Sequence, residues 1–261
     1  MKKYFVIGNP IEHSLSPKLH NHWINENKIR ATYEKKQITE SDLKRIIDEI
    51  KNDKISGINV TIPFKKAIIP FLDQLTPLAQ EAQSVNTVLK KDNKIIGDNT
   101  DIGGFQESVK NINYNVKDKK IFILGAGGVA PSIIIALTKL GASNISLSNR
   151  TKEKAENLKK IYSNLEIVDW GETPDFDMII NATSLGLKKN DEIKLNYQKI
   201  GKNKLFYDVI YSPNKTGFLV EAKQSGNKIE NGKMMFIYQA QLAFKIWHNI
   251  LPKINNKLLD L

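Results

Sequence analysis

The chain has 261 residues and a mass of 29.6 kDa, which fits one large or two medium domains and excludes a minimal module. Hydrophobic residues make up 41% and charged residues 26%, as in globular proteins, and no apolar run approaches the roughly 18 residues of a membrane span. The absence of cysteine excludes disulfides, thiolate zinc sites and a cysteine nucleophile. With no export signal behind Met1, we predict a soluble, cytoplasmic protein.

The net charge is +11 and the isoelectric point about 9.5, which raises the question of a nucleic-acid partner. The basic residues are almost all lysines mixed with Asp and Glu, and the only arginines are Arg30, Arg45 and Arg150. No basic helix with interleaved aromatic residues is present. We therefore expect a solvated, lysine-rich surface that attracts anionic small molecules, with neither nucleic acid nor membrane as partner.

The first hundred residues alternate between strand-like and helix-like patterns, which predicts an α/β layer structure. The predicted strands are 4–8, 31–38 and 57–62, the predicted helices 17–27 and 41–51, and a hairpin follows at 85–90 and 94–97.

A second alternation begins at Ile121 and continues to about Tyr211, so we predict two α/β domains with a boundary near residue 102. Apolar residues at helical spacing then run from Phe236 to Ile250, before Pro252. We expect this C-terminal helix to return to the first domain. The predicted domains are therefore 1–101 together with 236–261, and 102–235.

A glycine-rich loop follows the apolar strand 120–124 and precedes a helix-like segment, 133–140. It reads G-x-G-x-x-A, the dinucleotide fingerprint of a Rossmann domain. Gly125 suits the tight turn, Gly127 lets backbone N–H groups reach a pyrophosphate, and Ala130 lets the helix pack on the strand. The loop predicts a dinucleotide site formed by Gly125, Ala126, Gly127, Gly128, Val129 and Ala130.

The end of the next strand, 144–148, indicates which dinucleotide is bound. An NAD site would carry Asp or Glu there for the ribose 2′-OH, whereas this chain has Asn149, Arg150 and Thr151. Arg150 can stack on adenine or bind a 2′-phosphate, and Lys154 lies four residues further along the following helix. These residues favour NADP.

Several polar clusters lie in the first domain where strands should end. Ser14 and Ser16 precede Pro17 and could offer two hydroxyls to an anion, although Ser16 could instead be the N-cap of the helix. Alternation predicts Asn59 and Thr61 on one face of a strand. The other two clusters are 85–87 and 98–101.

Seven motifs in this order resemble the shikimate dehydrogenase family, and together they span residues 4 to about 250. They are G-N-P-I-x-H-S-x-S-P (8–17), N-V-T-x-P-x-K (59–65), V-N-T (85–87), D-N-T-D (98–101), G-A-G-G (125–128), N-R-T (149–151) and N-A-T-S-x-G (181–186). The resemblance implies a substrate domain followed by a Rossmann-like NADP domain. It also implies reversible NADPH-dependent reduction of 3-dehydroshikimate to shikimate, in the pathway to aromatic amino acids.

The resemblance also implies a role for individual residues. Lys65 would be the acid/base residue and would pair with Asp101. Ser14 and Ser16 would hold the substrate carboxylate, and the ring hydroxyls would meet Asn59, Thr61, Asn86, Asp101 and Gln239. Tyr211 would reach the substrate from the nucleotide domain, and Val209 and Gly232 would join the cofactor site. Ile102 and Met234 depart from the family pattern, which usually has glycine at both positions.

Three alternatives stay open. The nearest is a quinate/shikimate dehydrogenase of the same fold that uses NAD or NADP, although Arg150 argues against NAD. A catalytically silent nucleotide-binding regulator is a second, which the presence of both Lys65 and Asp101 disfavours. A nucleic-acid binder is the third. The four histidines form no ligand set with carboxylates, so no metal is expected; a homodimer is left open.

Overall fold

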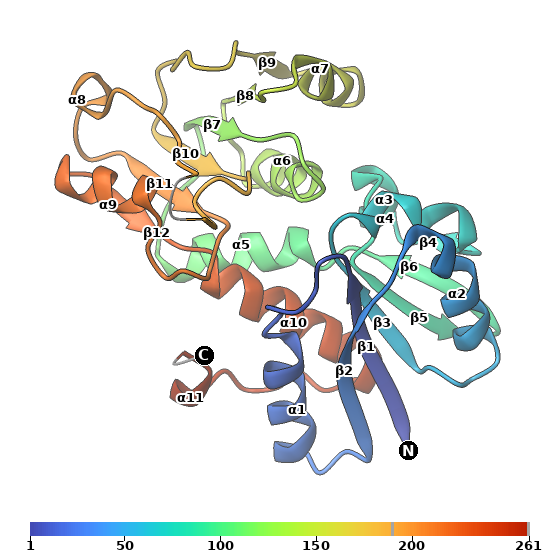
Figure 1. The fold of residues 1–261 in the computed structure, drawn as a ribbon. Helices are drawn as coiled ribbons and strands as arrows, with labels where there is room; N and C mark the ends of the chain where they lie inside the picture. The colour runs from blue at the N-terminus through green and yellow to red at the C-terminus, as the bar shows by residue number, and fades with distance from the viewer. Residues whose placement is uncertain (189–190, 260–261) are drawn as a thin grey trace. The chain divides into compact units, whose positions relative to one another are not determined.

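The computed structural model describes residues 1–188 and 191–259, so the last two residues of the predicted C-terminal segment 236–261 lie outside the described residues. The chain forms two compact units, one of residues 1–104 and 237–261 and the other of residues 105–236. Each contains a six-stranded sheet with helices (Figure 1). The predicted two-domain α/β fold is therefore confirmed.

The sheet of the first unit is mixed, in the order β2-β1-β3-β5-β6-β4. Strand β1 pairs in parallel with β2 and β3, whereas β3, β5 and β6 are antiparallel neighbours. The predicted hairpin is confirmed as β5 and β6, and it turns at Asp92 and Asn93, both with positive φ, as a two-residue hairpin favours. The strands are β1 Lys2–Gly8, β2 Ala31–Gln37, β3 Gly57–Val60, β4 Gln74–Leu75, β5 Thr87–Lys91 and β6 Lys94–Asp98.

Helices cover this sheet through apolar stripes. In α2 the buried residues are Leu43, Ile46, Ile47 and Ile50, a spacing that places them on one helix face toward the core. The short helices α3 and α4 were not predicted, since segments of one turn carry no clear periodicity. The α-helices with residues in this unit are α1 Ser16–Glu26, α2 Leu43–Lys51, α3 Phe64–Ala67, α4 Pro77–Ala82, α5 Asp101–Asn111, α10 Lys233–His248 and α11 Asn256–Leu259.

The sheet of the second unit is entirely parallel, in the order β12-β11-β10-β7-β8-β9. This is the doubly wound order, with the crossover point between β7 and β10. Buried apolar runs form its central strands, as expected where helices cover both faces. The elements are β7 Lys120–Leu124, α6 Ala130–Lys139, β8 Asn144–Ser148, α7 Lys152–Ile161, β9 Leu165–Ile167, β10 Met178–Asn181, α8 Tyr197–Ile200, β11 Leu205–Asp208, α9 Gly217–Gln224 and β12 Lys228–Glu230.

Two helices begin three residues earlier than predicted. Helix α6 begins at Ala130 because Pro131 is compatible with the first turn of a helix. Helix α10 begins at Lys233, whose backbone N–H donates to Oδ1 of Asn231 at 3.0 Å. A proline in the first turn of α6 and a side-chain acceptor before α10 thus allow each helix to begin before its apolar pattern.

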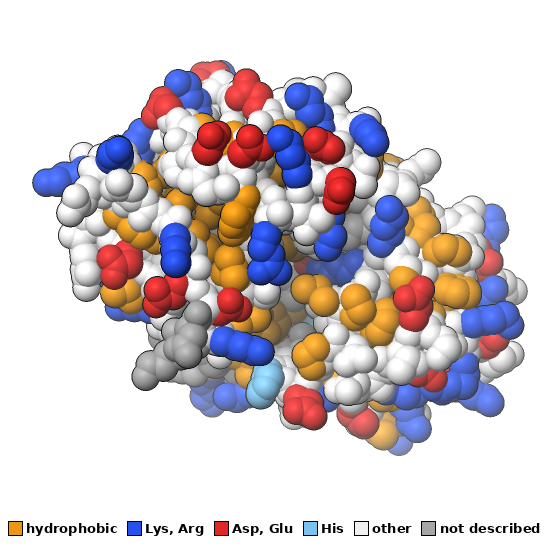
Figure 2. Space-filling model, turned by 45° about the horizontal axis from the view of Figure 1, so that its top comes forward, with side chains coloured by type: hydrophobic (Ala, Val, Ile, Leu, Met, Phe, Trp, Pro, Cys, Tyr) orange, Lys and Arg blue, Asp and Glu red, His pale blue; other side chains and the backbone are white. Residues whose placement is uncertain are grey.

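The surface carries charges of both signs. On the face drawn in Figure 2, Lys and Arg side chains are interspersed with Asp and Glu. Several lysines form exposed ion pairs, for example Lys120 with Asp175 at 2.9 Å. No helix in the described part of the chain is long and apolar enough to span a membrane.

Aromatic residues from both chain segments of the first unit pack around His20. Its ring stacks on that of Tyr33, with centroids 4.1 Å apart and planes 2° apart, and it also contacts Trp23, Phe244 and Trp247. His20 is 1% exposed, and neither ring nitrogen has a hydrogen-bond partner among the described residues. The imidazole is therefore held neutral in an apolar site.

Burial lowers the pKa of His20 to about 3, and the nearby His248 acts in the same direction. Burial likewise lowers the pKa of His248 to about 4, with Lys2 adding to the effect. Both groups bind a proton more readily in the unfolded chain, where the pKa of histidine is about 6.5. The free energy of unfolding should therefore fall as pH decreases from about 6.5 toward these values.

We predict that His20→Phe weakens this pH dependence. Phe keeps a ring against Tyr33 but cannot bind a proton, so the variant should lose about 1–2 kcal/mol less than wild type between pH 7 and pH 5. Urea unfolding at both pH values measures the difference. Equal losses in the two proteins would show that His20 is not a source of the pH dependence.

Candidate active site

The first unit gathers several predicted site residues around an ion pair. Nζ of Lys65, on α3, lies 2.5 Å from Oδ2 of Asp101, the first residue of α5. The exposed fractions of the two side chains are only 11% and 7%. The other carboxylate oxygen, Oδ1 of Asp101, accepts from Nδ2 of Asn86 at 2.9 Å. A largely buried ammonium is thus fixed beside a carboxylate whose two oxygens are each hydrogen-bonded.

Asn86 connects this pair to the surrounding backbone. Its Oδ1 accepts from the backbone N–H of Thr100 at 2.8 Å, and its Nδ2 donates to Oγ1 of Thr100 at 2.9 Å and to Oε1 of Gln239 at 3.4 Å. Gln239 comes close because Gly104 has no side chain: an added Cβ there would lie 2.7 Å from Cβ of Gln239. The structure therefore brings Lys65, Asp101, Asn86 and Gln239 together.

Asn59 belongs to the same buried network. Its Nδ2 donates at 3.0 Å to the backbone carbonyl of Asn86 and to Oγ1 of Thr87. Strand β3 ends at Val60, so Thr61 lies just beyond it, against Gly8, where an added Cβ would be 2.5 Å from Cγ2 of Thr61. A strand end and a glycine thus set the position of Thr61.

The two serines lie at the start of α1. The alternative that Ser16 is the N-cap is wrong: Leu15 occupies that position, and Oγ of Ser14 accepts from the backbone N–H of Ser16 at 3.3 Å. The Ser14 hydroxyl therefore satisfies the first backbone N–H of the helix, although it lies one residue before the N-cap. Ser16 is buried and its hydroxyl is not used as a cap.

The glycine loop of the second unit has the geometry of a phosphate cradle. Gly125 has a φ of 106°, and an added Cβ would lie 2.8 Å from the carbonyl oxygen of Ala182, so only glycine fits there. At Gly127 the nearest atom to an added Cβ is 3.9 Å away, which leaves its surroundings open. Ala126, Gly128 and Val129 complete the loop, and Ala130 is fully buried in the first turn of α6.

Asn149 connects the glycine loop to the end of β8. Its Oδ1 accepts from the backbone N–H of Ala126 at 3.0 Å, and its Nδ2 donates to the carbonyl of Thr151 at 2.8 Å. Arg150 and Lys154 are exposed, and neither has an ion-pair partner within residues 1–188 and 191–259. Two uncommitted cations therefore lie beyond β8, with no carboxylate where an NAD site would place one.

Val209 and Gly232 lie in contact. The backbone N–H of Gly232 donates to the carbonyl of Ile210 at 3.1 Å, and an added Cβ at Gly232 would lie 2.0 Å from the carbonyl oxygen of Val209. Tyr211 follows, with its ring stacked on Phe236 at 4.6 Å. The second unit therefore brings together the predicted residues at the end of β11.

Asp208, which the sequence analysis did not select, supports this loop. It is fully buried and accepts from Oγ1 of Thr216 at 2.6 Å, Nδ2 of Asn181 at 3.0 Å and the backbone N–H of Ile210 at 3.0 Å. Burial raises the pKa of Asp208, and the three hydrogen bonds oppose that effect. Its position directly before Val209 was the only signal in the sequence.

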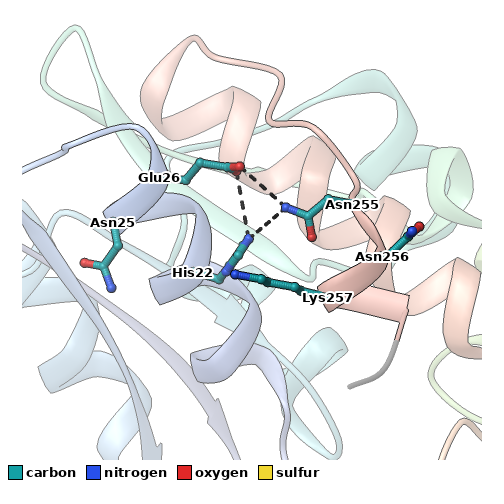
Figure 3. Close-up of a pocket in the computed structure, with 6 residues that line it drawn as sticks. All are labelled: His22, Asn25, Glu26, Asn255, Asn256 and Lys257. Atoms are coloured by element: carbon teal, nitrogen blue, oxygen red, sulfur yellow. Dashed lines mark hydrogen bonds and ion pairs between the residues drawn. The ribbon is translucent and has the colours of Figure 1, made fainter.

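A separate surface pocket is formed by other residues. Figure 3 shows His22 and Glu26 of α1 facing Asn255, whose Nδ2 lies 3.2 Å from Nε2 of His22. None of the predicted site residues lines this pocket, which is formed by His22, Asn25, Glu26, Asn255, Asn256 and Lys257. The described residues contain no group of three or more His, Cys, Asp or Glu side chains that could hold a metal ion.

Family models match segments in both units of the chain, and a curated relative matches its whole length. A family model described as the shikimate dehydrogenase substrate binding domain matches residues 6–88, and one described as shikimate / quinate 5-dehydrogenase matches residues 107–209. The chain is 61% identical over 262 residues to the shikimate dehydrogenase (NADP(+)) of Pelagibacter ubique. The aligned region covers 100% of this chain and 99% of that protein.

Solved structures are also similar over the whole fold. One is a shikimate dehydrogenase in complex with NADP+, with a TM-score of 0.93 and 36% identity over 100% of this chain and 95% of that one. Another is the shikimate 5-dehydrogenase of Thermus thermophilus in complex with NADP(H) and shikimate. Its TM-score is 0.89 and its identity 32%, over 97% of this chain and 95% of that one.

We predict that Gly232→Ala destabilises the second unit. A methyl group cannot occupy a point 2.0 Å from a carbonyl oxygen, so the backbone must shift, at a cost of about 1–3 kcal/mol in the free energy of unfolding. The matched control is Gly217→Ala, where the nearest atom to the added Cβ is 3.8 Å away and alanine suits a helix. Urea unfolding should separate the two variants; equal stabilities would contradict the close contact.

Proposed function

Because the chain belongs to the shikimate dehydrogenase family, we propose that it catalyses the reversible, NADPH-dependent reduction of 3-dehydroshikimate to shikimate, a step toward chorismate and the aromatic amino acids. The observation that carries the proposal is the largely buried pair of Lys65 and Asp101 within a network of amide side chains. We assign the substrate to the first unit and NADP to the second. Cytoplasmic location and homodimer formation stay predictions.

The residues of the second unit fit NADP. The open surroundings of Gly127 and the N-terminus of α6 suit a pyrophosphate, and Arg150 and Lys154 suit a 2′-phosphate. The other contacts that we assign to the cofactor are Gly125, Ala126, Gly128, Val129, Ala130, Asn149, Thr151, Val209 and Gly232. When bound, NADPH supplies the hydride.

In the first unit, Lys65 acts on the oxygen of the reacting group. Hydride addition to a ketone carbon leaves negative charge on that oxygen, and the ammonium of Lys65 stabilises this charge and gives the oxygen a proton. In the reverse direction the neutral amine takes the hydroxyl proton. Asp101 holds the ammonium in place through the 2.5 Å contact.

The remaining side chains of this unit bind and orient the substrate. Hydroxyl groups of the substrate can exchange hydrogen bonds with Asn59, Asn86 and Gln239, whose amides are already fixed by the buried network. We assign Ser14 and Ser16 to the carboxylate, and Thr61 and Asp101 to contacts with the ring substituents. From the second unit, we assign Tyr211 to the substrate as well. Fixed dipoles of this kind bind without a further cost of ordering.

An absorbance assay at the reduced-nicotinamide band tests the proposal. Shikimate and quinate are each offered with NADP and with NAD, which gives four rates. The highest rate is expected with shikimate and NADP. Preference for quinate or for NAD would instead support the quinate/shikimate alternative, and no turnover in any arm would support a silent nucleotide-binding protein.

We predict that Lys65→Ala lowers turnover by roughly 100-fold to 10,000-fold, as expected when a proton donor is removed from the transition state. The Michaelis constant for shikimate should change much less. The matched control is Lys66→Ala, which removes the exposed neighbouring lysine. Near-normal turnover of the Lys65 variant would rule out its acid/base role.

We predict that Arg150→Ala selectively impairs use of NADP. Loss of a charge-assisted hydrogen bond to phosphate should lower kcat/KM for NADP by roughly 10-fold to 100-fold, whereas NAD, which lacks that phosphate, should lose much less. Lys159→Ala, which removes a cation near the end of α7, is the control. Equal losses for both cofactors would indicate that Arg150 stacks on adenine instead.

A further inference from the structure

Tyr33 is a buried tyrosine that the sequence analysis did not select. It lies on the edge strand β2 and is 1% exposed. Its hydroxyl reaches past β1 to donate to Oδ1 of Asn59, on β3, at 2.7 Å. Tyr33, which is not itself a proposed substrate contact, therefore binds one of the proposed contacts, Asn59.

The hydrogen bonds of Asn59 leave its side chain able only to accept a hydrogen bond from a substrate. The carbonyl oxygen of Asn86 can only accept, so the side-chain NH2 of Asn59 must face it, and the second N–H donates to Thr87. Both donors are then used inside the protein. The Oδ1 atom has two lone pairs, of which Tyr33 takes one, so the second remains for a substrate hydroxyl.

Helix α1 fixes the position of Tyr33 at three points. The side chain of Asn21 pairs with its backbone, donating to the carbonyl at 2.7 Å and accepting from the N–H at 3.0 Å. The ring of His20 stacks flat on the phenol. Burial raises the pKa of Tyr33, so the hydroxyl keeps its proton and donates it to Asn59.

We propose that Tyr33 is a positioning residue for the substrate: its hydroxyl holds the carbonyl oxygen of Asn59 in place as a hydrogen-bond acceptor. The inference rests on the proposed function, because it assumes that Asn59 binds shikimate. It adds a residue that does not touch the substrate and acts through Asn59, which does.

The test compares Tyr33→Phe with Tyr4→Phe. Tyr4 lies on β1 directly opposite Tyr33 in the sheet register and is equally buried, so its variant also removes a buried phenol oxygen. For Tyr33→Phe we expect the Michaelis constant for shikimate to rise by roughly 3-fold to 10-fold, with that for NADP unchanged. Tyr4→Phe should leave both constants unchanged.

A double-mutant cycle with Asn59→Ala identifies the route of the effect. If Tyr33 acts through Asn59, adding Tyr33→Phe to Asn59→Ala should cause little further loss of kcat/KM, whereas independent roles would give multiplied losses. Wild-type constants for Tyr33→Phe, or multiplied losses, would overturn the inference while the wild-type rate still supports the proposed function. An inactive wild type would overturn the proposed function itself.

A measurement on the wild-type protein covers the case in which Tyr33→Phe does not fold. The hydroxyl proton of Tyr33 is buried and should exchange slowly enough to be observed by NMR. Because Tyr33 and the substrate would share the same oxygen of Asn59, saturating shikimate should shift this resonance, and saturating NADP alone should not. An unmoved resonance under shikimate would overturn the inference.

Discussion

The candidate site depends on how Asn86 satisfies buried polar groups. An unpaired amide or carboxylate in such a site would cost about 1–3 kcal/mol or more, so each buried group needs a partner. Asn86 provides them: its side chain meets Thr100 and Asp101, and its backbone carbonyl accepts from Asn59. Because Asp101 is fixed in this way, Lys65 is fixed as well. The position of Lys65, the proposed proton donor, thus follows from the hydrogen bonds of the neighbouring amides.

In the second unit, the buried carboxylate of Asp208 likewise needs hydrogen-bond partners. This carboxylate is buried among groups that are all donors, namely Thr216, Asn181 and the N–H of Ile210. Asn181 ends β10 and Asp208 ends β11, so the pair joins the carboxyl ends of neighbouring parallel strands. That edge is where open parallel sheets bind ligands, and the loop that carries Val209 is held there by hydrogen bonds rather than by packing alone.

Much of the fold could be predicted because it depends on patterns local to the sequence. The alternation of strands and helices, the glycine loop before α6 and the stripe on α2 are each readable within about ten residues. The antiparallel pairing of β3 with β5 was not readable, because it depends on contacts between distant segments. Local patterns also gave Ser16 as an equally good N-cap, whereas the structure places Leu15 at that position and Ser14 accepts from the N–H of Ser16.

Residues that only support the site were the hardest to predict. Tyr33 and Asp208 resemble ordinary core residues in the sequence, since a tyrosine suits a strand and an aspartate often ends one. Their importance lies in partners that are distant along the chain, Asn59 for Tyr33 and Asn181 for Asp208. Single motifs therefore point to the residues proposed to react more readily than to the residues that hold them in place.

The register of the mixed sheet explains why the substrate residues come from so many segments. Asn59 on β3 lies opposite Thr87 on β5, and Thr87 lies opposite Asp98 on β6. This row runs across three strands at the level where β3 and β6 end and β5 begins. A one-residue slip would turn each of these side chains to the other face of the sheet. The buried amide contacts and the apolar core therefore specify the same register, so the network that orients the substrate also helps to determine the fold that carries it.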